Sequence, residues 1–220
     1  MSEEAGAAAP QPDSARETVA SRLNELLAAA ALEPLDPQTA GRFADYCELL
    51  LRWNARTNLT AIRDREGVLS RHFVESIACA RALPAGIGTL LDFGSGAGFP
   101  GIPVALCRAE IAVTLAESQG KKAAFLREAV RVLGLTARVH AARAEGLRET
   151  FDCVALRAVD RIGDAVRTAL GLVGMGGRLA LMTTEEERKT LEASCGDGVS
   201  WERVVALPGD RRILMLGSKR

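Results

Sequence analysis

Apolar and polar residues follow different periods in two parts of the chain. Up to about residue 84, apolar residues recur at the three- to four-residue spacing of amphipathic helices. Beyond Pro84, short apolar runs alternate with glycine-rich turns and helical patterns, which favours buried strands joined by helices. The pattern therefore predicts an all-helical region at 15–84 and an α/β region at 85–220.

Three helix starts are indicated in the first part. Ser14 and Glu17 have the spacing of a capping box, and Asp36 with Pro37 is typical of an N-cap followed by proline. Asp64 opens the third helix, which should end before the next proline. Residues 1–14 are rich in Ala, Pro, Ser and Glu without periodicity, so they are expected to form a disordered tail.

Seven segments of the second part have the length and composition of strands. The first five are separated by helical patterns, which indicates parallel βαβ units and a mostly parallel, Rossmann-like sheet. The last two are joined by a short connection and should form an antiparallel hairpin at the sheet edge. The predicted strands span 89–93, 112–116, 137–141, 153–156, 178–182, 201–206 and 213–216.

Composition excludes several classes of protein. The chain has 220 residues, 28 Lys plus Arg against 28 Asp plus Glu, and no apolar run long enough for a membrane span. Zero net charge excludes a uniformly basic nucleic-acid coat but allows a local basic face. Five Cys at least 28 residues apart and only two His give no zinc-site spacing. We expect a soluble, cytoplasmic protein with reduced core cysteines, no membrane partner and no metal site.

The most informative stretch is the glycine-rich sequence LDFGSGAGFPGIP at 91–103. Alternating Gly94, Gly96 and Gly98 let the backbone approach a ligand where a Cβ would clash. Dinucleotide-binding enzymes have Gly or Ala where this chain has Phe99, so a pyrophosphate cradle is disfavoured. A nicotinamide dehydrogenase is therefore a distant alternative.

Two acids accompany this loop. Asp92 precedes it, and Glu117 ends the next predicted strand 25 residues later, where a carboxylate can accept both hydroxyls of a ribose. Ligands of open α/β sheets bind outside the carboxyl ends of the strands, where both acids fall. The arrangement fits S-adenosylmethionine, with the ribose on Glu117 and the amino-acid moiety near Gly94 and Asp92. The alternative is a tight turn with two solvated acids.

The end of the fourth predicted strand bears on the methyl acceptor. Arg157 lies where a buried strand opens into the cleft, and the alternative to a ligand contact is an ion pair with Asp160 or Asp92. The Leu-Arg-Ala-Val sequence at 156–159 lacks the Asn/Asp-Pro-Pro motif of amine methylation, and Cys153 lies too early to be a cytosine C5 nucleophile. Guanine N7 carries a lone pair and no proton, so positioning alone could suffice there.

Basic residues gather in two places despite the neutral total. Segment 121–148 alone has a formal surplus of five positive charges. Lys121 and Lys122 lie at the start of a predicted helix, where the helix dipole disfavours cations, so bound phosphate would compensate. A solvated helix face is the alternative. The candidate RNA contacts are Arg52, Arg56, Arg71, His72, Lys121 and Lys122.

With these motifs the chain resembles the small-subunit ribosomal RNA guanine-N7 methyltransferases, also called the glucose-inhibited division protein B family, over about residues 20–217. The resemblance rests on WNARTNLTAI at 53–62, RHFVES at 71–76, the glycine loop continued as FPGIP at 99–103, Glu117-Ser118 and GKK at 120–122. The first stretch and FPGIP are specific, whereas the GSGAG core is generic to class I methyltransferases.

The resemblance implies a helical N-terminal region on a seven-stranded class I S-adenosylmethionine-dependent methyltransferase fold. It implies methyl transfer to guanine N7 in the decoding-region loop of small-subunit (16S) ribosomal RNA. The family's cofactor contacts fall on Gly94, Phe99, Ala144, Glu145 and Arg157, beside Gly96 and Glu117. One departure is Leu156, where relatives often have Ser before the Arg.

No residue in this sequence is an evident catalytic base. Arg157 is a candidate positioning residue, and a cofactor-binding RNA chaperone or ribosome-assembly factor without turnover stays open as the alternative function. The expected partner is small-subunit ribosomal RNA or the small ribosomal subunit, and nothing in the sequence demands more than a monomer.

Overall fold

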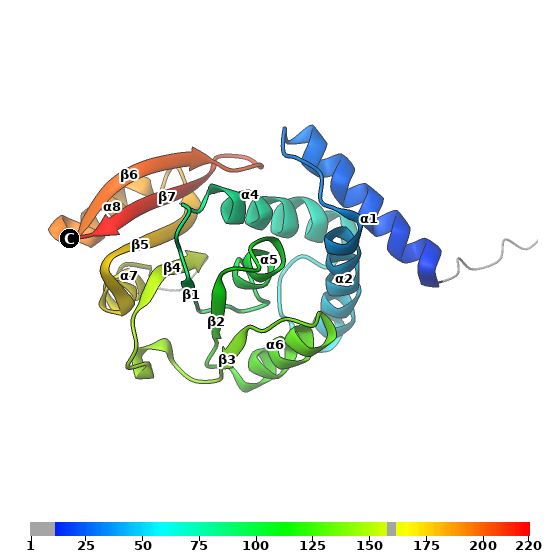
Figure 1. The fold of residues 1–220 in the computed structure, drawn as a ribbon, viewed down its shortest axis with the longest axis horizontal. Helices are drawn as coiled ribbons and strands as arrows, with labels where there is room; N and C mark the ends of the chain where they lie inside the picture. The colour runs from blue at the N-terminus through cyan, green and yellow to red at the C-terminus, as the bar shows by residue number, and fades with distance from the viewer. Residues whose placement is uncertain (1–11, 158–161) are drawn as a thin grey trace, which may run out of the picture.

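A computed structural model describes residues 12–157 and 162–220, and within them seven strands form one sheet (Figure 1). The strands are β1 (Thr89–Phe93), β2 (Ala112–Ala116), β3 (Arg138–His140), β4 (Phe151–Arg157), β5 (Val173–Thr184), β6 (Val199–Ala206) and β7 (Arg212–Lys219). Their order is β3-β2-β1-β4-β5-β7-β6. The first five run parallel, and β6 and β7 pair antiparallel at the edge, as the sequence predicts.

Helices cover both faces of this sheet (Figure 1). The α-helices are α1 (Pro12–Ala29), α2 (Pro37–Thr57), α3 (Arg65–Gly67), α4 (Val74–Ala82), α5 (Gly101–Cys107), α6 (Gly120–Val132), α7 (Ile162–Leu172) and α8 (Arg188–Cys195). A π-helical turn, η1 (Val68–Phe73), joins α3 to α4, and two 3₁₀ turns are η2 (Ala144–Gly146) and η3 (Gly196–Gly198). The apolar side chains of α1, α2 and α4–α6 form one core with one face, and those of α7 and α8 form a second core with the other.

The central strands are buried because helices lie on both of their faces. Four of the five residues of β1 are buried, so the strand reads as a continuous apolar run interrupted only by Asp92. The chain leaves β1 for β2 on one side, and β4 pairs with β1 on the other. This reversal of strand order places a topological switch point beside the carboxyl end of β1, where such sheets bind ligands.

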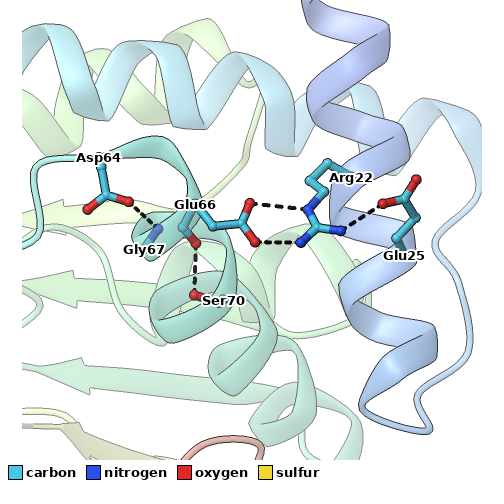
Figure 2. Close-up of polar contacts among 6 residues, drawn as sticks. All are labelled: Arg22, Glu25, Asp64, Glu66, Gly67 and Ser70. Carbon is cyan, nitrogen blue, oxygen red and sulfur yellow. Dashed lines mark hydrogen bonds and ion pairs between the residues drawn. The ribbon is translucent and has the colours of Figure 1, made fainter.

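Two of the predicted helix starts are confirmed by their caps. The Asp36 carboxylate accepts a hydrogen bond from Thr39 N at 3.0 Å at the start of α2, and that helix ends at Asn58 in a left-handed conformation. The Asp64 carboxylate accepts from Gly67 N at 2.7 Å (Figure 2). The helical stretch that Asp64 opens ends before Pro84, as expected, but contains a π turn that no sequence signal indicated.

The predicted capping box at Ser14 is wrong. Helix α1 already begins at Pro12, and the Ser14 carbonyl accepts from Thr18 Oγ1 at 2.7 Å inside the helix. Buried Val19, Leu23 and Leu27 show that the apolar stripe was assigned correctly. Residues 1–11 of the predicted tail lie outside the described residues.

Surface ion pairs attach α1 to the turn that precedes η1. Arg22 donates to both carboxylate oxygens of Glu66, at 3.1 and 2.7 Å, and to Glu25 at 2.8 Å, while Ser70 Oγ donates to the Glu66 carbonyl (Figure 2). All of these contacts are exposed, so water competes with them and their contribution to stability is small. The buried stripe of α1 holds the helix in place.

The connection from β3 to β4 differs from the prediction of helical crossovers throughout. Residues 141–150 carry only the three-residue turn η2. Ten residues are too few for a helix with a turn at each end, since a helical crossover usually needs a dozen or more. This short connection brings Ala144 to the carboxyl ends of the strands.

The helical region and the sheet share one core. Tyr46 of α2 stacks on Phe73 of η1 with ring centroids 5.1 Å apart, and its ring lies 5.5 Å from Phe99 of the glycine-rich loop. The apolar cluster that contains these rings runs from α1 to β7. The division into a helical region at 15–84 and an α/β region at 85–220 therefore stays a prediction.

Cysteines occupy interior positions. All five are free, four are buried, and Cys107 is half-buried, as the sequence predicts. Burial raises the pKa of Cys47 and Cys79 to about 12, so these thiols stay protonated. Along 12–157 and 162–220, no helix has the length and apolar character to cross a membrane, and no cluster of three metal-ligating side chains is found.

Candidate functional site

A cavity of about 660 Å³ lies over the carboxyl ends of β1, β2 and β4. Its volume falls within the range of small-molecule sites. One wall comes from the sheet and the loops that follow its strands, and another from the connection after α2 and from η1. Its lining includes Leu59, Thr60, His72, Phe93–Ala97, Phe99, Ala116–Gln119, Lys122, Ala142–Glu145, Arg157, Asp164, Ala165 and Thr168.

The glycine-rich loop forms the floor beside β1. Gly94, Gly96 and Gly98 have φ of 73°, 56° and 93°, a region that side chains rarely adopt. Ser95 ties the loop to the sheet, because its N–H donates to Ala116 O at 2.9 Å. A Cβ at Gly96 would meet only Gly94 O, at 3.9 Å, so this part of the loop faces open space. The loop therefore borders the cavity with room for a ligand beside Gly96.

Glu117 is held rigidly at the cavity wall. Its side chain is buried, Oε2 accepts from Gly96 N at 2.9 Å, and Oε1 accepts from Gln119 N at 2.7 Å. A carboxylate has about four lone-pair positions, so each oxygen can accept a further hydrogen bond. Two adjacent hydroxyl groups of a ribose match this remaining capacity.

Asp92 is placed differently from the prediction that it contacts the cofactor. It contributes nothing to the lining and is fully buried below the loop, where Oδ2 accepts from Gly101 N at 3.1 Å. Its Oδ1 has no hydrogen-bond partner among the described residues, and burial raises the pKa of the carboxyl to about 7. Side chains alternate along a strand, and here the alternation turns Asp92 toward α5. It supports the loop from behind.

Arg157 reaches the cavity from the end of β4 and is bound by α4 and η1. Its Nη2 donates to Glu75 Oε2 at 2.8 Å and to the Arg71 carbonyl at 2.7 Å, and Nη1 donates to Ser76 Oγ at 3.2 Å. The alternative ion pair with Asp92 is wrong, because the carboxylate partner is the buried Glu75. Asp160, the other alternative, lies outside the described residues.

His72 forms part of the cavity wall, which corrects its assignment to the basic RNA-binding surface. Its ring stacks on Phe99 with centroids 4.6 Å apart and planes 24° apart. Burial, with the positive charges of Arg157 and Arg71, lowers the pKa of His72 to about 3. The imidazole is therefore neutral at physiological pH and cannot pair with a phosphate as a cation. The Arg157 guanidinium carbon lies 5.7 Å from the same Phe99 ring, so the aromatic ring contacts both groups.

Of the other candidate RNA contacts, one lines this cavity and Arg71 lines a second cavity described below. Lys122 lines the first cavity, and the remaining four are exposed. No ion pair joins any of these five to an acid in the part of the chain that the structure describes, so their charge is available to a partner. The five are Arg52 and Arg56 of α2, Arg71 of η1, and Lys121 and Lys122 of α6.

Sequence reasoning missed several residues of the helical wall. Leu59 and Thr60 line the cavity, Glu75 binds Arg157, and the Tyr46 hydroxyl donates to the Ala97 carbonyl of the glycine-rich loop. Glu75 carried a usable signal, because an acid inside the apolar run from Phe73 to Ala80 must find a buried partner. Tyr46 carried none, since its spacing is that of an ordinary core position.

A second cavity, of about 730 Å³, lies between α1, α4 and the turn that joins β6 to β7. Its lining is mostly aliphatic and contains no acid, and arginines 71, 81 and 203 provide its charges. It lies away from the glycine-rich loop and Glu117. Its chemistry does not suit a ribose, so the smaller cavity is the better candidate for the predicted cofactor site.

The chain matches a protein family and named relatives over most of its length. The family model described as GidB, rRNA small subunit methyltransferase G, matches residues 40–205. The ribosomal RNA small subunit methyltransferase G of Xanthomonas campestris pv. campestris (strain B100) is 38% identical over 192 residues, covering 84% of this chain and 89% of that protein. That of Roseiflexus sp. (strain RS-1) is 44% identical over 152 residues, covering 66% of this chain and 65% of that protein.

Solved structures share the fold at low identity. A methyltransferase from Pyrococcus furiosus superposes with a TM-score of 0.59 at 15% identity, covering 82% of this chain and 98% of that one. TYW2 from M. jannaschii, determined in complex with AdoMet, gives a TM-score of 0.53 at 14% identity, covering 68% of this chain and 76% of that one. These likenesses show a methyltransferase fold.

Proposed function

The chain belongs to the rRNA small subunit methyltransferase G family, and we propose that it transfers a methyl group from S-adenosylmethionine to N7 of a guanine in small-subunit ribosomal RNA. The observation that carries the proposal is the buried Glu117 carboxylate fixed against the glycine-rich loop at the carboxyl ends of the strands.

The residues present fit the cofactor. Glu117 would accept the two ribose hydroxyls, and the backbone at Gly96 leaves space for the amino-acid moiety beside the lining residue Gly94. Ala144 and Glu145 line the cavity where η2 would lie against the adenine ring. S-adenosylmethionine supplies an electrophilic methyl group when it is bound. The chain's own contribution is to bind this group, orient it and exclude water around it.

The acceptor chemistry requires no base from the protein. The N7 atom of guanine has an in-plane lone pair and carries no proton, so no proton is removed before attack. His72 is the one imidazole among the described lining residues, and contacts with Thr60 and Arg157 occupy both of its ring nitrogens. This arrangement supports catalysis by positioning.

The basic surface supports a nucleic-acid partner. Lys122 at the start of α6 lines the cavity, and Arg56 lies in the last turn of α2, just before the lining residues Leu59 and Thr60. Neither basic side chain pairs with an acid among the described residues. Such side chains bind phosphates and give an affinity that falls with salt. We propose the small ribosomal subunit or its RNA as substrate, a monomeric enzyme, and a cytoplasmic location, where ribosomes assemble.

Incubation of the protein with methyl-labelled cofactor and small subunits that lack the modification tests the proposal. We expect label in one guanine, and strand scission at that site after borohydride and aniline treatment, because N7 methylation weakens the glycosidic bond. Glu117→Gln should weaken binding of S-adenosylhomocysteine about tenfold in calorimetry, since one charged acceptor is lost.

Glu149→Gln is the matched control. Glu149 is an exposed acid that pairs with Arg138 away from the cavity, so its loss should leave binding unchanged. Binding of cofactor and subunits without any methyl transfer would contradict the proposal and favour an RNA chaperone or assembly factor without turnover. Label at a base position other than N7 would contradict the acceptor assignment.

A further inference from the structure

A series of half-buried polar contacts connects the two walls of the cavity. Thr60 N donates to Asn54 Oδ1 at 2.9 Å, and Thr60 Oγ1 lies 2.8 Å from His72 Nε2. On the other side of the imidazole, Arg157 Nη2 lies 3.2 Å from His72 Nδ1 and donates to Glu75 Oε2 at 2.8 Å. Asn54 and Glu75 at its two ends are 2% and 3% exposed, whereas Thr60, His72 and Arg157 between them are half-buried and line the cavity.

The chemistry of arginine fixes which group donates and which accepts in the hydrogen bonds of His72. An arginine side chain can only donate, so His72 Nδ1 must accept. The ring proton of the neutral imidazole therefore sits on Nε2 and is donated to Thr60 Oγ1. Protonation of Nδ1 would break the contact with Arg157 and place two cations side by side in a buried site. His72 is therefore a neutral connector with one defined tautomer.

The backbone of η1 presents this connector. Val74 N donates to Leu69 O, the five-residue spacing of a π turn, and π turns concentrate at functional sites. The turn directs the Arg71 carbonyl to Arg157 at 2.7 Å and lays the His72 ring on Phe99. One imidazole thus contacts the glycine-rich loop, the end of β4 and the connection after α2.

The connection after α2 adjoins the basic surface. Thr60 and Leu59 line the cavity, and Arg56 is exposed in the last turn of α2 just before them. Arg71, also exposed, directly precedes His72. An RNA that binds these arginines would contact the segments at both ends of the His72–Thr60 hydrogen bond.

We propose that His72 is a positioning residue that couples the RNA-facing connection at Leu59–Thr60 to Arg157 and Phe99 in the cofactor cavity. The inference rests on the proposed function and deepens it. RNA binding and the geometry of the cofactor site are linked through the His72–Thr60 hydrogen bond, while the Arg157–Glu75 ion pair anchors this series of contacts to α4.

Thr60→Val tests the coupling because valine keeps the shape of threonine and removes the hydroxyl, leaving Arg157 and Glu75 untouched. Valine also removes the acceptor of Ile62 N, which donates to Thr60 Oγ1 at 3.2 Å. We expect kcat/KM for small subunits to fall about tenfold from loss of the hydroxyl's contacts with His72 and Ile62, while the Kd for S-adenosylhomocysteine changes less than twofold. Thr60→Ser restores the hydroxyl and should recover most of the rate.

Thr57→Val is the matched control. Thr57 Oγ1 donates to the Trp53 carbonyl within α2, three residues before Thr60, and takes no part in this series of contacts. Its kcat/KM should equal that of the unsubstituted protein. Circular dichroism of all variants checks that each one is folded.

Two substitutions of His72 each remove one of its two hydrogen bonds and can keep the other. In His72→Asn the amide oxygen can replace Nδ1 as the acceptor for Arg157, and in His72→Gln the amide nitrogen can replace Nε2 as the donor to Thr60. Each keeps one half of the connection, so both should lose activity if the coupling needs both halves.

Specific outcomes would overturn the inference. Unsubstituted rates for Thr60→Val or for His72→Asn would show that the link to Thr60 is unnecessary, and failure of Thr60→Ser to recover would show that the hydroxyl is not the active feature. A rise in the Kd for S-adenosylhomocysteine equal to the fall in kcat/KM would confine the role to cofactor binding. Absence of turnover in the unsubstituted protein would instead overturn the proposed function.

Discussion

The two walls of the cofactor cavity are built in different ways. The sheet wall, which consists of the 94–99 loop, Glu117 and η2, is held mainly by contacts between neighbouring strand ends, such as Gly96 N to Glu117. The helical wall, which consists of Leu59, Thr60 and His72 with Tyr46 and Glu75 behind them, is held by side chains. Its Glu75–Arg157 contact joins residues 82 positions apart in the chain.

This difference shows how a general fold acquires a particular site. Any chain with a glycine-rich turn after a buried strand and an acid after the next can build the sheet wall. The helical wall needs aromatic packing of Tyr46 on Phe73 and Phe99, and the packing of η1 against β4. In the proposed function the sheet wall would bind the cofactor, and the helical wall would provide the setting in which an RNA meets it.

Gly101→Ala should break the sheet wall with the largest effect. A Cβ at Gly101 would lie 2.4 Å from Leu115 Cδ2 and 2.6 Å from Asp92 Oδ2, so the loop and α5 must shift. We expect a loss of about 3 kcal/mol in the free energy of unfolding, from overpacking in a buried site. Binding of S-adenosylhomocysteine should weaken at least tenfold in calorimetry. Gly120→Ala, where no heavy atom lies within 4 Å of the new Cβ, should change neither quantity appreciably.

The next largest expected effect is on the pH dependence of stability, which differs between the two walls. In the sheet wall, burial raises the pKa of Asp92 from 3.8 to about 7, so the folded protein holds this proton more tightly than the unfolded chain does. Asp92 therefore lowers stability as pH rises from about 4 to 7. Asp92→Asn removes the penalty, and its stability relative to the unsubstituted protein should rise by about 2 kcal/mol between pH 5 and 7.

Titration of His72 in the helical wall changes stability with pH in the opposite direction. Its pKa falls from 6.5 to about 3, so the unfolded chain binds this proton more tightly and stability is lost as pH falls through that window. His72→Gln should therefore gain about 2 kcal/mol relative to the unsubstituted protein between pH 6 and 4. Urea unfolding at each pH measures both variants, and parallel pH curves for either variant and the unsubstituted protein would contradict the assignment.

Tyr46→Phe tests the contact between the two walls. The Tyr46 hydroxyl donates to the Ala97 carbonyl, so its removal leaves a buried acceptor without its partner while the stacked ring remains. We expect a loss of about 1 kcal/mol of stability and a severalfold weaker binding of S-adenosylhomocysteine. Denaturant unfolding and calorimetry report the two effects. A stability loss with unchanged binding would mean that the helical wall does not support the loop.

Arg22→Ala should give the smallest effect. Its ion pairs with Glu66 and Glu25 connect α1 to α3 on the surface, outside both walls (Figure 2). Exposed pairs compete with water and are screened by salt, so the thermal midpoint should shift little and cofactor binding should not change. Any change in cofactor affinity would show that the helical wall depends on α1 more than its buried contacts indicate.

Local signals predicted one part of the site and missed the other. Gly94, Gly96 and Glu117 line the cavity, because the turn after β1 and the residue after β2 lie where their neighbours in sequence place them. Phe99, Ala144 and Glu145, which only the family resemblance indicated, line it as well. Asp92 was predicted to contact the cofactor and His72 to contact RNA, whereas Asp92 is buried below the loop and His72 forms part of the cavity wall. Nothing adjacent in sequence tells a buried carboxyl below a loop from one that touches a ligand.

The sequence by itself determined most of the elements, the parallel direction of the first five strands and the position of the glycine-rich loop, since strand burial, caps and glycine turns are properties of short segments. Tertiary structure alone decided which charges meet. Arg157 pairs with Glu75, and neutral His72 lies between Phe99, Thr60 and Arg157, because the packing of η1 against the sheet removes these groups from water. A buried charge or imidazole must satisfy its hydrogen bonds with whatever the fold brings near, and that choice is made across the whole chain.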